Sequence, residues 1–288
     1  MKLSISNLCK TYPNGVKAIN DLSLDINDGL FGLLGPNGAG KSSLMRTIAT
    51  LQEADSGNIF LDDIDVLKEK DEIKKLLGYL PQDFGFFPGI SATDLLNYFA
   101  VLKGYENKKE RKETVNYLLN QVNLYDKRKS KVNQYSGGMM RRFGIAIALL
   151  GDPRLIIVDE PTAGLDPSER IRFNNLLSEI SENKIVILST HIVSDVSDLC
   201  HEMAIINNGS LKAQGNPTSL LEELEGTVWE KKVSKEELSQ YKEEHNVLCS
   251  WLHEGEPILH IHSNNNPGNG FKQASIRLED VYFNTLNQ

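Results

Sequence analysis

The start of the chain alternates between apolar and polar positions in two separate segments. Residues 2–8, KLSISNL, and residues 18–26, AINDLSLDI, carry an apolar side chain at nearly every second position. This period of two is typical of strands that bury one face and leave the other in water. The first part of the chain therefore predicts an antiparallel β subdomain.

Further along, short and almost wholly apolar runs alternate with longer segments of helical period. The runs predict buried parallel strands at residues 30–35, 76–82, 154–160 and 184–190, with a further strand at 58–66. Helices are predicted within residues 36–51, 91–130, 143–150, 170–181 and 194–200. Ser91 and Thr93 are the expected helix caps. Strands that alternate with helices favour a parallel, twisted α/β sheet.

The last quarter of the chain differs in composition from the rest. The whole chain of 288 residues has a net charge of −8, and residues 218–288 contain six Lys and Arg against twelve Asp and Glu, a net −6. This segment predicts strands at 227–233 and 256–262, a helix at 234–244 and a final helix within 275–286. We therefore expect a first unit over 1–217, with a helical subdomain at about 84–150, and a small α+β C-terminal domain over 218–288.

Composition argues against several classes of function. The acidic balance disfavours a nucleic-acid partner, because such proteins neutralise phosphates with Lys and Arg. No apolar run approaches the roughly 20 residues that span a bilayer, so the chain is not expected to cross a membrane by itself. The residue types that most often bind transition metals are scattered: Cys9, Cys200, Cys249, His253, His260 and His262. Their spacing predicts reduced thiols in a cytosolic protein and no metal site among these histidines.

A glycine-rich loop supplies the first chemical motif. GPNGAGKS, from Gly35 to Ser42, fits G-x-x-x-x-G-K-[ST] between a predicted strand and a predicted helix. Backbone N–H groups and the helix N-terminus can hold phosphates there, Lys41 can reach the β- and γ-phosphates, and the Ser42 hydroxyl can bind Mg²⁺. The residues expected to bind ATP in this loop are Gly35, Asn37, Gly38, Ala39, Gly40, Lys41, Ser42 and Ser43.

Two adjacent carboxylates end the strand predicted at 154–160. Asp159 can hold the Mg²⁺, directly or through water, and Glu160 can polarise an attacking water. A kinase would need its base to face a second substrate. Two adjacent carboxylates with no obvious acceptor pocket favour ATP hydrolysis instead.

A second candidate phosphate receptor is the tripeptide Ser136, Gly137 and Gly138, directly before a predicted helix. A hydroxyl and two glycines at a helix start allow close backbone approach to a phosphate. One α/β core has no need to surround the same γ-phosphate twice, so a second copy of the chain is expected to close each site. YSGGM, residues 135–139, resembles the signature segment of ABC transporter ATP-binding subunits.

The resemblance covers about residues 1–217 and implies a RecA-like P-loop core. It implies roles for four residues outside the motifs above. Tyr12 would stack on adenine, Gln82 would reach Mg²⁺ and the water, Asp166 would cross the dimer interface, and His191 would contact the γ-phosphate. Tyr135, Met139 and Ser43 depart from the usual residues, but none of these changes removes a phosphate-contacting group. The signature and the ending LEDV resemble the export-type branch with a small C-terminal domain.

The family resemblance also implies partners. Integral-membrane subunits would dock near residues 83–94, which would place the chain at the cytoplasmic face of a membrane. Phe84, Phe86 and Phe87 either form that docking groove or pack inside the helical subdomain. The ATP-bound state would be a homodimer or a pair with a second ATP-binding subunit. The alternatives are a soluble ABC-type ATPase that acts as a non-transport clamp and, less favoured, a P-loop kinase.

Overall fold

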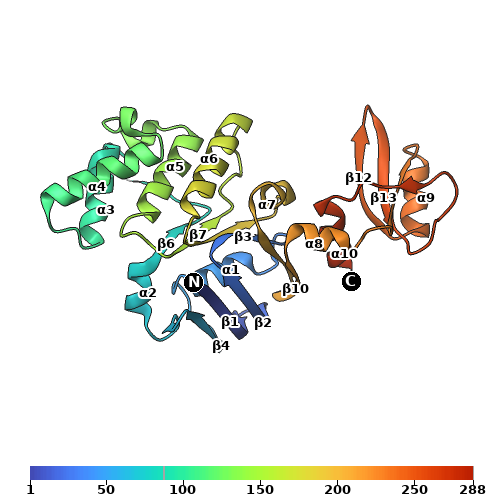
Figure 1. Ribbon diagram of the computed structural model, residues 1–288, viewed down its shortest axis with the longest axis horizontal. Helices are drawn as coiled ribbons and strands as arrows, with labels where there is room; N and C mark the ends of the chain where they lie inside the picture. The colour runs from blue at the N-terminus through green and yellow to red at the C-terminus, as the bar shows by residue number, and fades with distance from the viewer. Residues whose placement is uncertain (87, 288) are drawn as a thin grey trace.

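A computed structural model describes residues 1–86 and 88–287 (Figure 1). Its centre is a six-stranded sheet in the order β10-β9-β3-β8-β7-β6, in which only β10 is antiparallel to its neighbour. The strands are β3 (Gly29–Leu34), β6 (Leu77–Leu80), β7 (Leu155–Asp159), β8 (Ile185–Thr190), β9 (Glu202–Asn207) and β10 (Ser210–Gly215). Every residue of β7 and β8 is buried, as expected for parallel strands covered on both faces. The predicted α/β class is confirmed.

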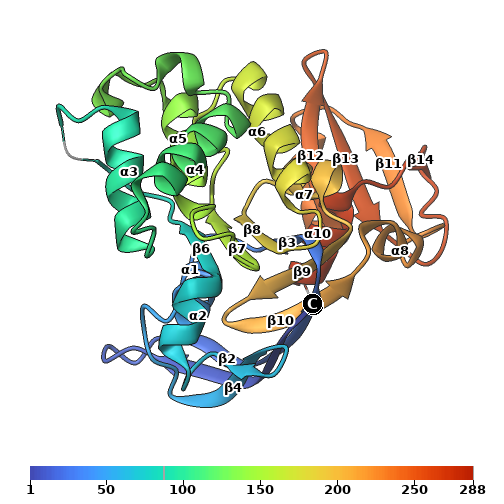
Figure 2. The ribbon, with the colours of Figure 1, turned by 60° about the vertical axis from the view of Figure 1, so that its left-hand side comes forward.

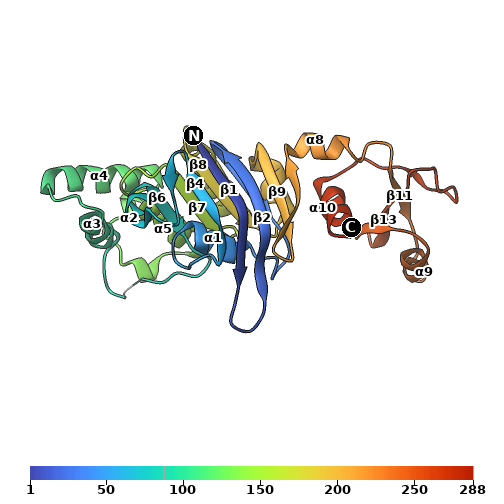
Figure 3. The same cartoon turned by 90° about the horizontal axis from the view of Figure 1, so that it is seen from below.

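A four-stranded antiparallel sheet packs on one face of the central sheet (Figure 3). It has the order β2-β1-β4-β5, from β1 (Lys2–Thr11), β2 (Lys17–Asn27), β4 (Ser56–Leu61) and β5 (Ile64–Asp65). Its inward side chains share a core with α1 (Lys41–Ile48) and with β3, β7 and β8. The single strand predicted at 58–66 is wrong, because the chain turns at Asp62, where φ is 51°, and pairs β4 with β5.

Helices cover the other face of the central sheet (Figure 2). They are α3 (Ala92–Leu102), α4 (Lys108–Gln121), α5 (Gly137–Ala148), α6 (Pro167–Ile180) and α7 (Val193–Leu199), while α2 (Lys70–Leu76) precedes β6. Ser91 caps α3 by accepting from the Asp94 N–H at 3.2 Å. Thr93 is not a cap, because it lies inside α3 and its hydroxyl donates to the Arg128 carbonyl.

The C-terminal segment forms a third sheet in the order β12-β13-β11-β14. Its strands are β11 (Val228–Lys232), β12 (Val247–His253), β13 (Glu256–His262) and β14 (Lys272–Gln273), with helices α8 (Pro217–Glu222), α9 (Glu237–Glu244) and α10 (Leu278–Asn287). Leu278, Val281 and Tyr282 of α10 belong to the same hydrophobic core as α7 and the helical face of the central sheet. The last helix therefore fastens this segment to the rest of the molecule (Figure 1).

Candidate functional site: a phosphate loop with two carboxylates

The loop between β3 and α1 exposes backbone N–H groups at a helix start. Gly40 caps α1 in a left-handed conformation, with φ 105°, and no side chain accepts from the first turn, which also lacks an acidic residue. A Cβ on Gly40 would lie 2.2 Å from the Ala18 carbonyl oxygen, and one on Gly35 would lie 2.4 Å from that of Ile206. Only glycine fits at these two positions, and the resulting loop forms an anion site.

Lys41 closes this loop from within. Its Nζ donates to the Gly35 carbonyl at 2.6 Å and to the Pro36 carbonyl at 3.2 Å. Burial lowers the pKa of Lys41, an effect that the Glu160 carboxylate, 3.6 Å from Nζ, opposes. A bound phosphate would add negative charge beside this buried cation and so favour its protonated form.

Asp159 lies at the carboxyl end of β7, near Ser42 and almost fully buried. Burial raises the pKa of its carboxyl group, while the nearby Ser189 and Ser42 hydroxyls and Lys41 act in the opposite direction. Within the described residues, Asp159 Oδ1 and Ser189 Oγ have no hydrogen-bond partner. Buried oxygens without partners are costly, and hydroxyl and carboxylate oxygens are ligands that Mg²⁺ prefers. The residues present therefore fit a hydrated Mg²⁺ ion at this place.

Glu160 follows Asp159 but points elsewhere because its backbone is left-handed, with φ 48°. Its N–H donates to the Ser189 carbonyl at 2.8 Å, which fixes this unusual conformation. His191 Nδ1 lies 2.7 Å from Glu160 Oε2, and the imidazole is the donor because an ionised carboxylate only accepts. The carboxylate thus stands between Lys41 and His191.

Most of these groups line one hollow of about 340 Å³, although Gly35 and Asp159 are not among its lining residues. Of the predicted residues it brings together Tyr12, Asn37, Gly38, Ala39, Gly40, Lys41, Ser42, Ser43, Gln82, Glu160 and His191. The Tyr12 hydroxyl lies 3.0 Å from Ser43 Oγ and donates to Gln52 Oε1, so its ring is anchored at the start of α1. Val16, Ala18 and Pro36 also line the hollow, and no sequence signal pointed to Val16 or Ala18.

The predicted residues Ser136, Gly137, Gly138 and Asp166 do not line this hollow. Ser136 caps α5 by accepting from the Met139 N–H at 3.2 Å, and Asp166 caps α6 by accepting from the Glu169 N–H at 2.9 Å. The two helix starts are fastened together, because Arg142 pairs with Glu169 and a Cβ on Gly138 would collide with Glu169. Within one chain, these residues therefore lie apart from the hollow that contains Lys41.

A buried polar network that sequence reasoning missed supports the loop that follows Glu160. Asp195 of α7 is fully buried, accepts from the Thr162 hydroxyl at 2.5 Å and accepts from Arg170 Nε at 2.8 Å. Thr190, next to His191, is 3.4 Å from the same carboxylate. These residues are distant in sequence and belong to no motif, so only the tertiary structure reveals that they position Glu160 and His191.

The start of the segment predicted for docking, residues 83–94, packs against α5. Arg141 of α5 donates to the Gln82 carbonyl at 2.6 Å, and its guanidinium lies 5.4 Å from the Phe84 ring centre. Phe86 makes edge contacts with Phe84 and Phe143 at 5.5 and 5.3 Å. Of the two readings of the phenylalanines, Phe84 and Phe86 follow the packing one, while Phe87 lies outside the described residues.

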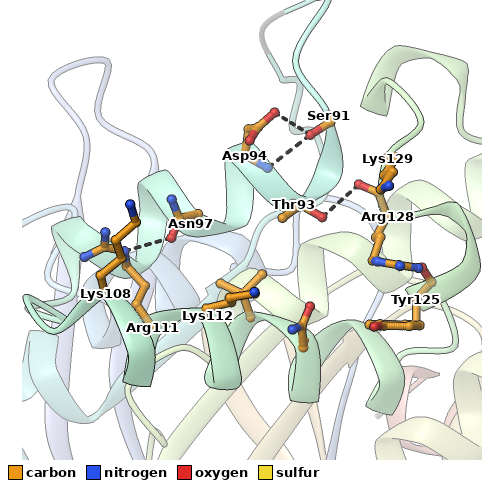
Figure 4. A pocket seen from close by; sticks show the side chains of 12 residues that line it. Ser91, Thr93, Asp94, Asn97, Lys108, Arg111, Lys112, Tyr125, Arg128 and Lys129 are labelled. Carbon is orange, nitrogen blue, oxygen red and sulfur yellow. Dashed lines mark hydrogen bonds between the residues drawn. The ribbon is translucent and has the colours of Figure 1, made fainter.

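Two further hollows lie at the edges of the helical subdomain. A polar one of about 710 Å³, between α3 and α4, carries five cationic side chains: Lys108, Arg111, Lys112, Arg128 and Lys129 (Figure 4). An apolar groove of about 790 Å³ runs between the end of α1, β6 and the end of α3. Leu51 and Leu102 in that groove are 59% and 64% exposed. Among the described helices, none is long and apolar enough to cross a bilayer.

Comparison with known proteins connects this geometry to a family. A family model described as ABC transporter matches residues 19–163. The uncharacterized ABC transporter ATP-binding protein YxlF of Bacillus subtilis (strain 168) is 34% identical over 243 residues, which cover 84% of this chain and 80% of YxlF. The lipopolysaccharide export system ATP-binding protein LptB of Escherichia coli (strain K12) is 33% identical over 225 residues, 77% of this chain and 93% of LptB.

A solved structure shows the same fold. The dimeric ATP-binding cassette MJ0796, in a post-hydrolysis state bound to ADP and Pi, is 25% identical and has a TM-score of 0.67, covering 74% of this chain and 98% of that one. This likeness confirms the predicted P-loop NTPase fold. The chain belongs to the ABC transporter family, as one of its ATP-binding and ATP-hydrolysing subunits.

Proposed function

We propose that this subunit dimerises around two ATP molecules and powers export through separate membrane subunits. The observation that carries the proposal is the division of the phosphate-binding groups. The hollow with Lys41 and Glu160 lacks Ser136, Gly137 and Gly138, which stand at the start of another helix. A second copy of the chain, turned by a two-fold axis, would bring its Ser136 to the first copy's phosphates.

Each residue of the hollow has a defined task in this proposal. The α1 N-terminus and Lys41 hold the phosphates, and Tyr12 packs against the base. Ser42, Asp159 and Gln82 would hold Mg²⁺, which would neutralise charge on the phosphates when it is bound. Gln82 belongs to the loop that Arg141 fastens to α5, so movement at the phosphates reaches the helical subdomain.

Glu160 accepts a proton from the attacking water, and His191 keeps the carboxylate oriented toward it. The proposed product ADP lacks the γ-phosphate, so contacts from the partner's signature residues are lost. Hydrogen bonds to charged groups each contribute about 1.5–3 kcal/mol, so the loss of a few per site is enough to open the dimer. Asp166, as the cap of α6 beside Gly138, would lie at the same interface.

The test pairs two inactive variants. Lys41→Ala removes the phosphate cation, and Ser136→Arg blocks the signature. In a mixed dimer, one site combines both defects while the other is intact, so random pairing would restore about one quarter of wild-type ATP turnover. Mixing each variant with itself is the control. The proposal of a site shared between two chains is wrong if the mixture of the two variants shows no ATP turnover and light scattering detects no ATP-dependent dimer of Glu160→Gln protein.

Export is supported by the resemblance to LptB, which belongs to a lipopolysaccharide export system. We propose that membrane subunits hold the chain at the cytoplasmic face of a membrane and dock near residues 83–94. The apolar groove around Leu51 and Leu102 adjoins this region through β6, which ends two residues before Gln82. A short amphipathic helix of the membrane subunit would bury these exposed side chains.

The docking proposal is tested with a matched pair of surface changes. Leu102→Asp places a charge in the groove, whereas Tyr117→Asp places one on α4 outside it, where the side chain is similarly exposed at 63%. Co-purification with a co-expressed membrane subunit should fall at least tenfold for Leu102→Asp alone. Equal recovery of both variants would place the docking surface elsewhere.

We further propose the division into a cassette over 1–217 and an accessory domain over 218–288. In support, the third sheet pairs only with itself among the described strands. The boundary falls at Pro217, the first residue of α8.

A further inference from the structure

We infer that the C-terminal domain carries a site for a zinc-like divalent cation, formed by Cys249, His260 and Asp280. One ligand atom from each residue lies within 4.8 Å of the other two. Cys249 Sγ is 3.3 Å and His260 Nδ1 is 2.8 Å from the same atom, Asp280 Oδ1. Cys249 and His260 belong to no motif described above, Asp280 lies in the LEDV segment at residues 278–281, and none of the three lies near the phosphate loop in sequence.

The sheet builds this cluster from three elements. Cys249 on β12 and Glu230 on β11 both pair with His260 on β13, so the three residues form one row across the sheet. Residues that face one another in this way project from the same side of a sheet. Asp280 arrives on that side from α10, and its Oδ2 is held by the Arg277 N–H at 2.9 Å.

The cluster is buried, so a charged group in it must be balanced by a group of opposite charge. Asp280 has no exposed surface and His260 is 1% exposed. The Cys249 thiol donates a hydrogen bond to Asp280 Oδ1, the same oxygen that His260 Nδ1 faces. A divalent cation with one thiolate, one carboxylate and one neutral imidazole makes a neutral buried unit, which avoids the cost of a lone buried charge.

The surroundings of His260 match those of a ligating histidine. Its Nε2 lies 3.4 Å from Glu230 Oε2, so a proton on Nε2 faces a carboxylate and Nδ1 keeps a lone pair for the cation. Both ring nitrogens of His260 face carboxylate oxygens, Nδ1 that of Asp280 and Nε2 that of Glu230. A cation between Nδ1 and Asp280 Oδ1 would leave the Nε2–H to donate to Glu230, which is the usual arrangement of a metal-bound imidazole.

The distances suit a small tetrahedral ion after a small adjustment. Bonds of about 2.3 Å to sulfur and about 2.0–2.1 Å to nitrogen and oxygen separate neighbouring ligand atoms by about 3.3–3.6 Å. The sulfur–oxygen separation of 3.3 Å must open by about 0.3 Å and the nitrogen–oxygen separation of 2.8 Å by about half an ångström, within reach of side-chain rotation, while the sulfur and nitrogen atoms lie within 4.8 Å of each other. The mix of thiolate and imidazole favours Zn²⁺ over Mg²⁺ or Ca²⁺. Cys249 is half-buried, so the fourth position can take water from solvent.

The test uses the full-length, untagged, nucleotide-free chain, reduced and freed of metal with a chelator. Titration with Co²⁺ should give one equivalent of binding with thiolate-to-cobalt charge-transfer absorption, which Zn²⁺ then displaces. Cys249→Ser should abolish this absorption, and Glu230→Gln should weaken binding about 10–100-fold. Cys9→Ser and His253→Gln, which alter the same residue types outside the cluster, should leave both unchanged.

A second readout does not depend on absorption. Zn²⁺ should raise the unfolding temperature of the wild-type chain and of His253→Gln, but not that of Cys249→Ser, because only a bound cation stabilises the folded state. The half-buried cysteine tolerates serine, so the variant folds and the comparison is valid. Absence of a charge-transfer band in the wild type, or a band that survives Cys249→Ser, overturns the inference.

Discussion

The nucleotide hollow and the Cys249–His260–Asp280 cluster are built by opposite means. The hollow takes most of its lining from eight consecutive residues, 36–43, and from backbone N–H groups whose direction the loop itself fixes. The cluster takes single side chains from β12, β13 and α10. A site made from backbone must keep its local sequence, whereas a site made from side chains depends only on which strands and helices meet. The first can be found as a motif, and the second cannot.

The largest effect is expected at the carboxylate of the hollow. Glu160→Gln should reduce ATP turnover at least 100-fold, because the amide cannot accept the proton of the attacking water. ATP binding should persist, and light scattering should show an ATP-dependent dimer. Glu179→Gln, on the exposed face of α6, is the control and should keep wild-type turnover. Unchanged turnover in the Glu160 variant would sink the assignment.

The next largest effect is expected from Gly40→Ala, which tests whether the backbone of the loop forms the nucleotide hollow. Gly40→Ala should lower nucleotide affinity at least tenfold and destabilise the fold by about 1–3 kcal/mol, because the methyl group meets the Ala18 carbonyl at a left-handed position. Nucleotide titration and thermal unfolding measure the two quantities. Gly137→Ala, whose methyl group meets nothing within 4 Å, should leave the unfolding temperature almost unchanged. A harmless Gly40→Ala would show that the loop is not fixed by this contact.

The smallest effect on ATP binding is expected from a substitution in the Cys249–His260–Asp280 cluster. It tests whether the cluster is independent of the nucleotide hollow. His260→Ala should destabilise the metal-free chain by about 1–3 kcal/mol, since it removes one of the hydrogen-bond partners of the fully buried Asp280. ATP affinity should change by less than about twofold, because the two sites share no residue. Denaturant unfolding and nucleotide titration on one preparation provide both numbers. His253→Ala, at an exposed position of β12, is the matched control. A large loss of ATP affinity in His260→Ala would show that the cluster and the nucleotide hollow are energetically coupled.

Some strands could be predicted from the sequence and others could not, and the reason differs from strand to strand. The strands predicted at 154–160 and 184–190 lie at β7 and β8, because continuous apolar runs of this length fit only a sheet covered on both faces. The tail strand β12 was not predicted, since its apolar positions are interrupted by Ser250 and two exposed residues, Leu252 and His253. Its register comes from pairing with β13, which is a non-local interaction.

The same limit applied to histidines and cysteines. Spacing along the chain predicted no metal site among His253, His260 and His262. The site that we infer at His260 departs from this prediction. Pairing of β12 with β13 brings Cys249 to His260, and α10 brings Asp280 from twenty residues further along the chain. Linear spacing cannot anticipate ligands that three separate elements contribute.

What the sequence alone determined is the chemistry of ATP: the phosphate loop, the paired carboxylates and the signature segment are local patterns whose function follows from backbone geometry and adjacent side chains. Only the tertiary structure decided that Asp195 supports the loop after Glu160 and that Phe84 and Phe86 pack inward. These facts depend on packing between elements distant in the chain, where the free energy comes from buried contacts that no short segment contains.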